Sequence, residues 1–145
     1  MDLGHWESKC GEPIGFEELD FIGFVYIIKN NKDNKSYIGK KQCMTIVRRP
    51  PLKGKKRKRL IKNQTDWKKY TGSSNYLNDD IEKHGIENFS FLILKWCNSK
   101  WMLGYEEAKL QFEEEVLLTD KYYNGIINLR IGKRPKSADV EILLG

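Results

Sequence analysis

The chain has 145 residues and a net charge of +6, and 39% of its residues are hydrophobic and 32% charged. This length suits one domain with a buried core, and no apolar run approaches the roughly 20 residues that cross a bilayer. Three widely spaced cysteines and two histidines exclude a zinc pattern and a His-rich catalytic site. Residues 1–18 are acidic and lack the features of a signal peptide, so we expect a cytoplasmic location without membrane contact.

The first predicted elements form a hairpin. Residues 1–21 contain Gly, Pro and acids and predict an irregular arm. Residues 24–28 are a β-branched and aromatic run that predicts a strand, residues 30–34 are turn formers, and residues 35–39 return as a second strand. Two short strands joined in this way predict an antiparallel hairpin.

A basic segment follows the hairpin. Residues 42–69 contain a proline pair and a glycine and predict an extended, mobile insertion. Residues 48–69 hold eleven Lys or Arg and one acid, Asp66, so this window carries +10 and the rest of the chain −4. This contrast predicts a surface that binds phosphate, although a loop kept soluble by its charge would have the same composition.

A helix and a third strand are predicted next. The helix begins after Gly72, with Ser73 or Ser74 as its cap, and ends at Gly85. Residues 88–96 are a largely apolar run that predicts a buried strand.

A long second helix is predicted over residues 103–119. Leucines share its apolar face, namely Leu103, Leu110, Leu117 and Leu118. The order strand, strand, helix, strand, helix predicts an α+β fold with a small three-stranded, mainly antiparallel sheet flanked by helices.

Two tyrosines, Tyr26 and Tyr37, lie on the paired strands. Taken alone, they are explained as ordinary strand aromatics. However, Lys40 and Lys41 follow Gly39 at the end of the second strand. Neighbouring cations lower the pKa of a phenol and bind phosphate, so this pattern favours a phosphate site.

These residues resemble the two-part signature of the GIY-YIG nucleases. Phe24-Val25-Tyr26 stands where the family has Gly-Ile-Tyr, and Tyr37-Ile38-Gly39 matches the second half. Downstream, Tyr70-Thr71-Gly72-Ser73, His84-Gly85 and Asn88-Phe89 resemble the helix and third strand of free-standing phage homing endonucleases.

The resemblance covers roughly residues 22–130, which we expect to form a GIY-YIG-like nuclease domain. The basic insertion at 42–69 lies within it. An N-terminal arm at 1–21 and a C-terminal tail at 131–145 complete the expected organisation.

The resemblance implies an endonuclease that hydrolyses DNA phosphodiester bonds with Mg²⁺ or Mn²⁺. It implies one catalytic, metal-binding glutamate on the second helix and an asparagine beyond that helix, which Asn124 matches. Glu107 fits the glutamate best because leucines flank it one turn away on each side. Glu113 and Glu114 remain alternatives.

The remaining catalytic roles follow from what phosphodiester hydrolysis needs. The arginine that the family has beyond its second motif corresponds to Arg48 or Arg49, or Lys41 replaces it, and this cation would bind the scissile phosphate. Either tyrosine would orient or deprotonate the attacking water, with a pKa lowered by Lys40 or Lys41. The expected catalytic set is Tyr26, Tyr37, Lys41, Arg48, Glu107 and Asn124.

Contacts with nucleic acid are assigned mainly to the basic insertion. It would bind the DNA backbone without reading sequence, and binding would weaken steeply with salt. The residues assigned this role are Lys40, Arg49, Lys53, Lys55, Lys56, Arg57, Lys58, Arg59, Lys62, Lys68 and Lys69. Trp67, Tyr70 and Trp101 either stack on bases or belong to the core.

Several alternatives stay open on this fold. A restriction or repair nuclease, a non-catalytic nucleic-acid-binding module and a basic domain that contacts an acidic protein share the same features. Cutting both strands would require a homodimer or sequential nicking. A phage-encoded enzyme would act in the cytoplasm of its bacterial host.

Overall fold

An antiparallel hairpin is the centre of the fold, as predicted. The computed structural model describes residues 2–11 and 21–136, and in it strand β2 (Gly23–Asn30) pairs with β3 (Ser36–Gln42). The turn between the strands contains Asn34 at φ 62°, a conformation that asparagine tolerates better than most residues. Residues 12–20 of the predicted arm and 137–145 of the predicted tail lie outside the described residues.

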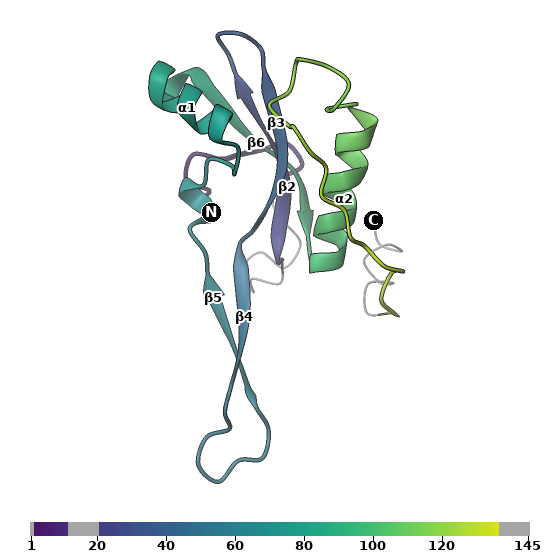
Figure 1. Ribbon diagram of the computed structural model, residues 1–145. Helices are drawn as coiled ribbons and strands as arrows, with labels where there is room; N and C mark the ends of the chain where they lie inside the picture. Colours follow the sequence, from purple (N-terminus) through teal and green to yellow (C-terminus); the bar gives the residue numbers. More distant parts are fainter. Residues whose placement is uncertain (1, 12–20, 137–145) are drawn as a thin grey trace.

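The main sheet has four strands rather than the predicted three. Strand β6 (Phe89–Cys97) pairs antiparallel with β2, and β1 (Glu7–Ser8) pairs parallel with β6, which gives the order β1-β6-β2-β3. The prediction of an irregular arm was wrong at β1, because two residues are too few for a periodic pattern. One edge of this sheet is β3, and the site described below forms along it (Figure 1).

Helix α1 (Asn75–His84) follows the prediction closely. The hydroxyl of Ser74 accepts a hydrogen bond from the third residue of the helix, and Gly85 ends it. This cap leaves the neighbouring Ser73 available for other contacts.

Helix α2 (Lys100–Glu113) ends earlier than the predicted helix over residues 103–119. Glu115 adopts φ 54°, which breaks the helical path, and Leu118 is 80% exposed. The leucine pattern was therefore misleading at this end. No helix in the described parts of the chain is long and apolar enough to cross a membrane.

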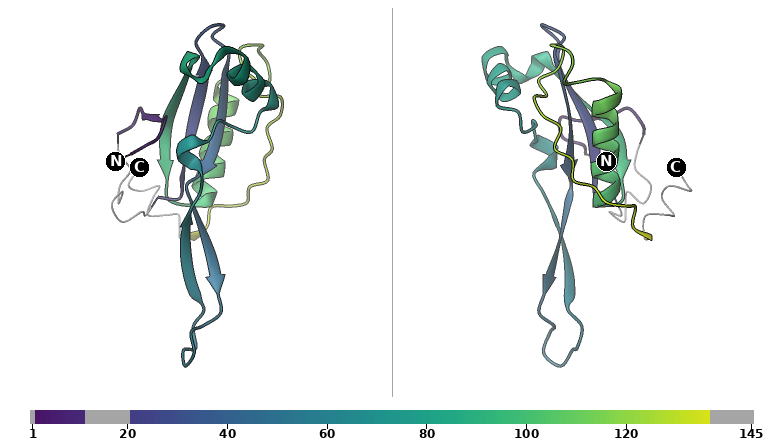
Figure 2. Two further views of the ribbon diagram at one scale, coloured as in Figure 1. Left: turned by 90° about the vertical axis from the view of Figure 1, so that its left-hand side faces the viewer. Right: turned by 45° about the vertical axis from the view of Figure 1, so that its right-hand side comes forward.

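The core lies on both faces of the sheet. Figure 2 shows α2 against one face of the sheet and α1 on the side of the other. The face under α1 includes Trp6, Phe24, Tyr26, Trp67 and Leu77, and the face under α2 includes Val25, Ile38, Met102, Leu103 and Val116. Strand alternation explains why neighbours such as Val25 and Tyr26 belong to different clusters.

The basic insertion, predicted as an extended segment, contains a two-stranded ribbon that the sequence did not predict. Strand β4 (Met44–Arg49) pairs antiparallel with β5 (Arg59–Gln64), and the twisted pair projects from the rest of the domain (Figures 1 and 2). Pro50 and Pro51 lie beyond β4, in the turn, where a missing N–H removes no ladder hydrogen bond.

Candidate active site

Tyr26 and Tyr37 lie on the same face of the hairpin, one on each strand. Tyr26 is opposite Gly39, and the two tyrosine ring centroids are 6.2 Å apart. A Cβ atom at Gly39 would lie 2.5 Å from Tyr26 Oη and 2.9 Å from Tyr37 Cε1. The second motif therefore needs glycine at this position because the two rings occupy the space that a side chain would fill.

A β-bulge lies beside Tyr26. In the pairing of β2 with β6, Val25 is opposite Lys95 but Tyr26 is opposite Ile93, so Leu94 is the extra residue. Bulges redirect neighbouring side chains and are frequent next to active sites. The first motif is thus placed on a locally irregular part of an otherwise regular sheet.

A third tyrosine, Tyr70, joins this pair. Its ring packs edge-on against Tyr26 at 6.2 Å, and the ammonium group of Lys41 lies 4.1 Å from its centroid. Lys41 also forms an ion pair with Asp66 at 2.9 Å. The sequence predicts Tyr70 only as a base-stacking or core residue. Its position in the Tyr-x-Gly-Ser segment is the sequence feature that could have indicated that it belongs to the candidate site.

The loop before α1 closes the other side of the cluster. Ser73 Oγ lies 2.9 Å from Tyr37 Oη. Gly72 has φ 85°, and a Cβ there would lie 3.4 Å from Tyr26 Oη. Glycine adopts this backbone conformation without strain, and the turn brings the loop close to both phenols.

Glu107 approaches the same cluster from α2. Its carboxylate is partly buried and interacts electrostatically with the phenols of Tyr26 and Tyr37. The backbone N–H of Lys40, on edge strand β3, hydrogen-bonds to this carboxylate. We infer that Glu107 reaches the tyrosines past this edge, since α2 packs on the other face of the sheet.

The alternative glutamates lie elsewhere. Glu113 and Glu114 are exposed at the end of α2, and Glu114 accepts a long hydrogen bond of 3.4 Å from Tyr122 Oη. Of the three candidates, the structure brings only Glu107 to the tyrosines.

Burial controls the protonation of the cluster. It raises the pKa of Glu107 above its ordinary value, although the Lys40 ammonium opposes this effect. Burial likewise raises the pKa of Tyr26 well above its usual range, and it raises the pKa of Tyr37 although the hydrogen bond between Tyr37 and Ser73 acts in the opposite direction. Both phenols are therefore neutral hydrogen-bonding groups at physiological pH.

The expectation that lysines lower these tyrosine pKa values was wrong. Lys40 and Lys41 follow Gly39 in sequence, but strand alternation sends them in different directions. The Lys40 ammonium lies 3.7 Å from where a Cβ of Gly104 on α2 would be, and Lys41 pairs with Asp66. Neither ammonium offsets the desolvation of the phenols.

Asn124 holds the free edge of β3. Its Oδ1 accepts from the backbone N–H of Ile38 at 3.0 Å, and its Nδ2 donates to the carbonyl of Ile38 at 2.8 Å. Gln111 of α2 donates to the same carbonyl at 3.0 Å. Because both amide atoms of Asn124 bond to the strand that carries Tyr37 and Lys40, we assign it a positioning role.

Arg48 lies apart from the tyrosine cluster. It is on β4, opposite Leu60 in the projecting ribbon. The structure therefore brings Lys41, but not Arg48, to the tyrosines. After the second motif the chain continues into the ribbon, and both arginines lie on its strand β4.

The cations assigned to nucleic acid are spread over three elements. Lys40 is on β3, and the short helix η2 (Trp67–Lys69) contains two more. The strands of the ribbon contain Arg49, Arg59 and Lys62, and its turn contains Lys53, Lys55, Lys56, Arg57 and Lys58. Of the aromatic residues considered for stacking, Trp67 is 1% exposed and belongs to the core.

The donor set fits a hard divalent cation. Within residues 2–11 and 21–136 no group of three His, Cys, Asp or Glu side chains forms a metal cage. One partly buried carboxylate, Glu107, suits Mg²⁺, which binds proteins through one or two carboxylates and keeps several of its waters.

A comparison with known protein families identifies the chain. The family model described as "Putative endonuclease segE, GIY-YIG domain" matches residues 6–127, which span β1 to α2 and include the tyrosine cluster, Glu107 and Asn124. No curated protein and no solved structure matches the chain. The chain belongs to the GIY-YIG endonuclease family.

Proposed function

We propose that this protein is a metal-dependent endonuclease that hydrolyses DNA phosphodiester bonds, in the manner of a free-standing phage homing enzyme. The observation that carries the proposal is the meeting of Tyr26, Tyr37 and Glu107, from two faces of the sheet, at the edge of β3. A partly buried carboxylate whose pKa is raised, next to two phenols, is a kind of perturbed group that gathers at functional sites.

Glu107 would hold Mg²⁺ or Mn²⁺, which acidifies water and neutralises charge on phosphate oxygens when bound. The Lys40 backbone N–H fixes the orientation of the carboxylate. Tyr37 is the more accessible phenol and would orient the attacking water by a hydrogen bond, with Ser73 fixing its hydroxyl. Tyr26 is 1% exposed, and its ring packs next to the ring of Tyr37 on the inner side of the cluster.

Lys41 would bind the scissile phosphate. Its ammonium group lies beside Tyr70 and is paired with the exposed carboxylate of Asp66. An exposed ion pair contributes little, so a phosphate can replace the carboxylate as the partner of Lys41. The cation role that the family gives to an arginine is assigned here to Lys41.

The ribbon of β4 and β5 would hold the duplex. A two-stranded antiparallel ribbon fits the major groove of B-DNA, and its turn contains five cations, Lys53, Lys55, Lys56, Arg57 and Lys58. Contacts from these residues to phosphates provide affinity and register but no sequence readout. Nuclease domain 22–130 thus combines a catalytic edge with a basic arm.

Plasmid nicking in Mg²⁺ tests this proposal. Glu107→Gln should abolish cutting, and Tyr37→Phe should reduce it by about 10²-fold because one positioned hydrogen bond is lost. Glu113→Gln is the matched control, since it makes the same change on an exposed part of α2 and should cut like the wild type. Full activity of Glu107→Gln would refute the site.

Two further measurements separate the remaining functions. Salt-sensitive DNA binding without cutting in Mg²⁺ or Mn²⁺ would identify a non-catalytic binding module. Sequencing the cut sites in a randomised DNA pool would distinguish a homing nuclease, with one long target, from a restriction enzyme. Sedimentation of the protein on its target would show whether a homodimer cuts both strands.

A further inference from the structure

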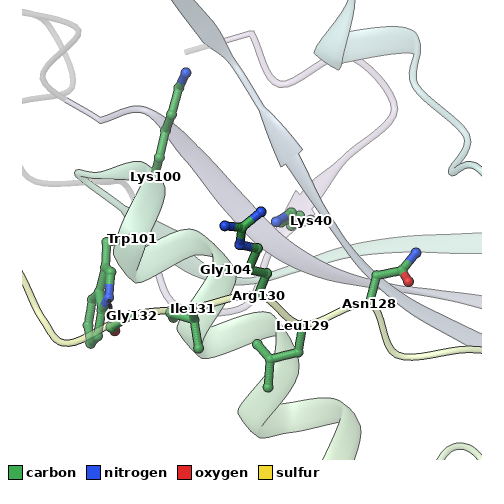
Figure 3. A pocket seen from close by; sticks show the side chains of 9 residues that line it. All are labelled: Lys40, Lys100, Trp101, Gly104, Asn128, Leu129, Arg130, Ile131 and Gly132. Atoms are coloured by element: carbon green, nitrogen blue, oxygen red, sulfur yellow. Dashed lines mark hydrogen bonds between the residues drawn. The ribbon is translucent and has the colours of Figure 1, made fainter.

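A basic pocket of about 340 Å³ lies between α2 and the chain segment 128–132 (Figure 3). Its lining contains three cations, Lys40, Lys100 and Arg130, and no acid. Two of them, Lys100 and Arg130, are absent from the residues that the sequence assigns to nucleic acid. The pocket therefore needs an explanation of its own.

The wall of this pocket is fixed to the helix. The indole N–H of Trp101 donates to the carbonyl of Gly132 at 3.0 Å, and the Trp101 ring stacks on Tyr105 at 5.0 Å. The segment that carries Arg130 is thereby attached to α2 at one end. The pocket wall formed by residues 128–132 is therefore held against α2 by a hydrogen bond.

Gly104 of α2 lines the pocket beside Lys40. A Cβ at this position would make an ordinary van der Waals contact of 3.7 Å with the Lys40 ammonium. The Lys40 ammonium therefore lies close to the helix surface at Gly104.

Of the three cations, Lys40 is partly compensated by the Glu107 carboxylate. Figure 3 shows the guanidinium of Arg130 on the side of the pocket where Lys40 lies, while the Lys100 side chain extends away from both. Among the described residues, neither Arg130 nor Lys100 forms an ion pair. Like charges held together repel, and an anion bound between them removes that repulsion. The planar fork of arginine matches the oxygens of a phosphate.

Lys40 connects the pocket to the active site. Its backbone N–H bonds to the Glu107 carboxylate, while its side chain lines the pocket. We propose that the pocket binds a backbone phosphate next to the scissile one, on the same strand; this rests on the proposed function.

Duplex binding without metal provides the first test. Fluorescence anisotropy at several salt concentrations gives the slope of log K against log salt, which changes by about 0.9 for each phosphate contact. Arg130→Gln should reduce this slope by about that amount. The control Lys83→Gln removes the same charge from an exposed position on α1 and should leave the slope unchanged. Equal slopes for both variants would overturn the proposal.

Single methylphosphonate substitutions locate the contact. A neutral linkage placed in turn at each position beside the cut should slow the wild type at one neighbouring position, and Arg130→Gln should be insensitive there. If Arg130→Gln keeps the wild-type pattern, the pocket binds no neighbouring phosphate. A wild type that binds but never cuts refutes the proposed nuclease, while the salt slope still decides the pocket.

Discussion

Gly39→Ala is the variant that tests the geometry of the site most directly. The added Cβ would lie 2.5 Å from Tyr26 Oη and 2.7 Å from Tyr26 Cζ, distances at which something must move. Tyr26 has little room, since it is 1% exposed and packs against Trp6 at 5.0 Å. The shift must therefore come from Tyr37 or from strand β3 itself.

The size of the effect follows from two opposing terms. An extra methyl group in a packed core destabilises the fold by about 1–3 kcal/mol. Replacing glycine by alanine stabilises it by about 0.4–1 kcal/mol, because alanine has less conformational entropy in the unfolded chain. The net loss should be about 1–2 kcal/mol, which lowers Tm by roughly 3–8 °C at this chain length. Cleavage should fall about 10²-fold, because a displacement of ~1 Å near the reacting groups costs that much.

Calorimetry gives the Tm, and plasmid nicking well below both melting temperatures gives the rate. Gly125→Ala is the matched control, because nothing lies within 4 Å of its added Cβ, and its stability should change by less than about 0.5 kcal/mol. Combining Gly39→Ala with Tyr26→Phe removes the closest contact, so the double variant should be more stable than the sum of the single changes predicts. If Gly39→Ala matches Gly125→Ala in both assays, the close packing of the tyrosines is refuted.

Three other predictions concern stability. Asn124→Asp removes one of the two side-chain donors to the carbonyl of Ile38, and Gln111 remains as the other, so urea denaturation should show a loss of about 0.5–1.5 kcal/mol. An unchanged midpoint would contradict the positioning of β3 by Asn124. Glu107→Gln should raise the Tm of the metal-free protein at neutral pH. The pKa of Glu107 in the folded protein lies above the ordinary 4.5, so the wild type loses stability as pH rises from 4.5 through that folded pKa. Below about pH 4.5 the variant and the wild type should have the same Tm. Burial lowers the pKa of His5 below 6.5, so on acidification the unfolded chain takes up a proton before the folded chain does, and the free energy of unfolding should fall as pH drops through that value. His5→Phe should weaken this pH dependence. Identical pH profiles for the variant and the wild type would exclude His5 as its source.

Local chemistry in the sequence was sufficient for the hairpin and for α1. The β-branched run of β2, the turn formers after it and the Ser74 and Gly85 caps are all short-range signals. These predictions are confirmed because the tertiary contacts of the hairpin and of α1 agree with the local preferences. The two-part signature lies on this hairpin, and the downstream segments that support it flank α1 and begin β6, so short-range patterns indicate the family correctly.

Long-range features were hidden from the sequence. The ribbon was missed because its cations outnumber the β-branched residues that favour strands. The choice among the glutamates of α2 depends on which turn of the helix passes the edge of β3, a tertiary property. The rise in the tyrosine pKa values has the same origin, because desolvation depends on what covers a phenol and not on its sequence neighbours.

The edge of β3 links folding to catalysis. An uncovered edge strand has unpaired N–H and C=O groups and is prone to unwanted pairing. Here the backbone of residues 121–123 pairs with Ser36 in a parallel bridge. Asn124 and Gln111 bond to Ile38, and Glu107 bonds to Lys40, so α2 and the segment after it cover this edge with both backbone and side chains. The residues that cover this edge are also those that bring the carboxylate to the tyrosines. The contacts that cover the edge of β3 and the contacts that place Glu107 near the tyrosines therefore come from the same packing of α2 and the segment after it on this strand.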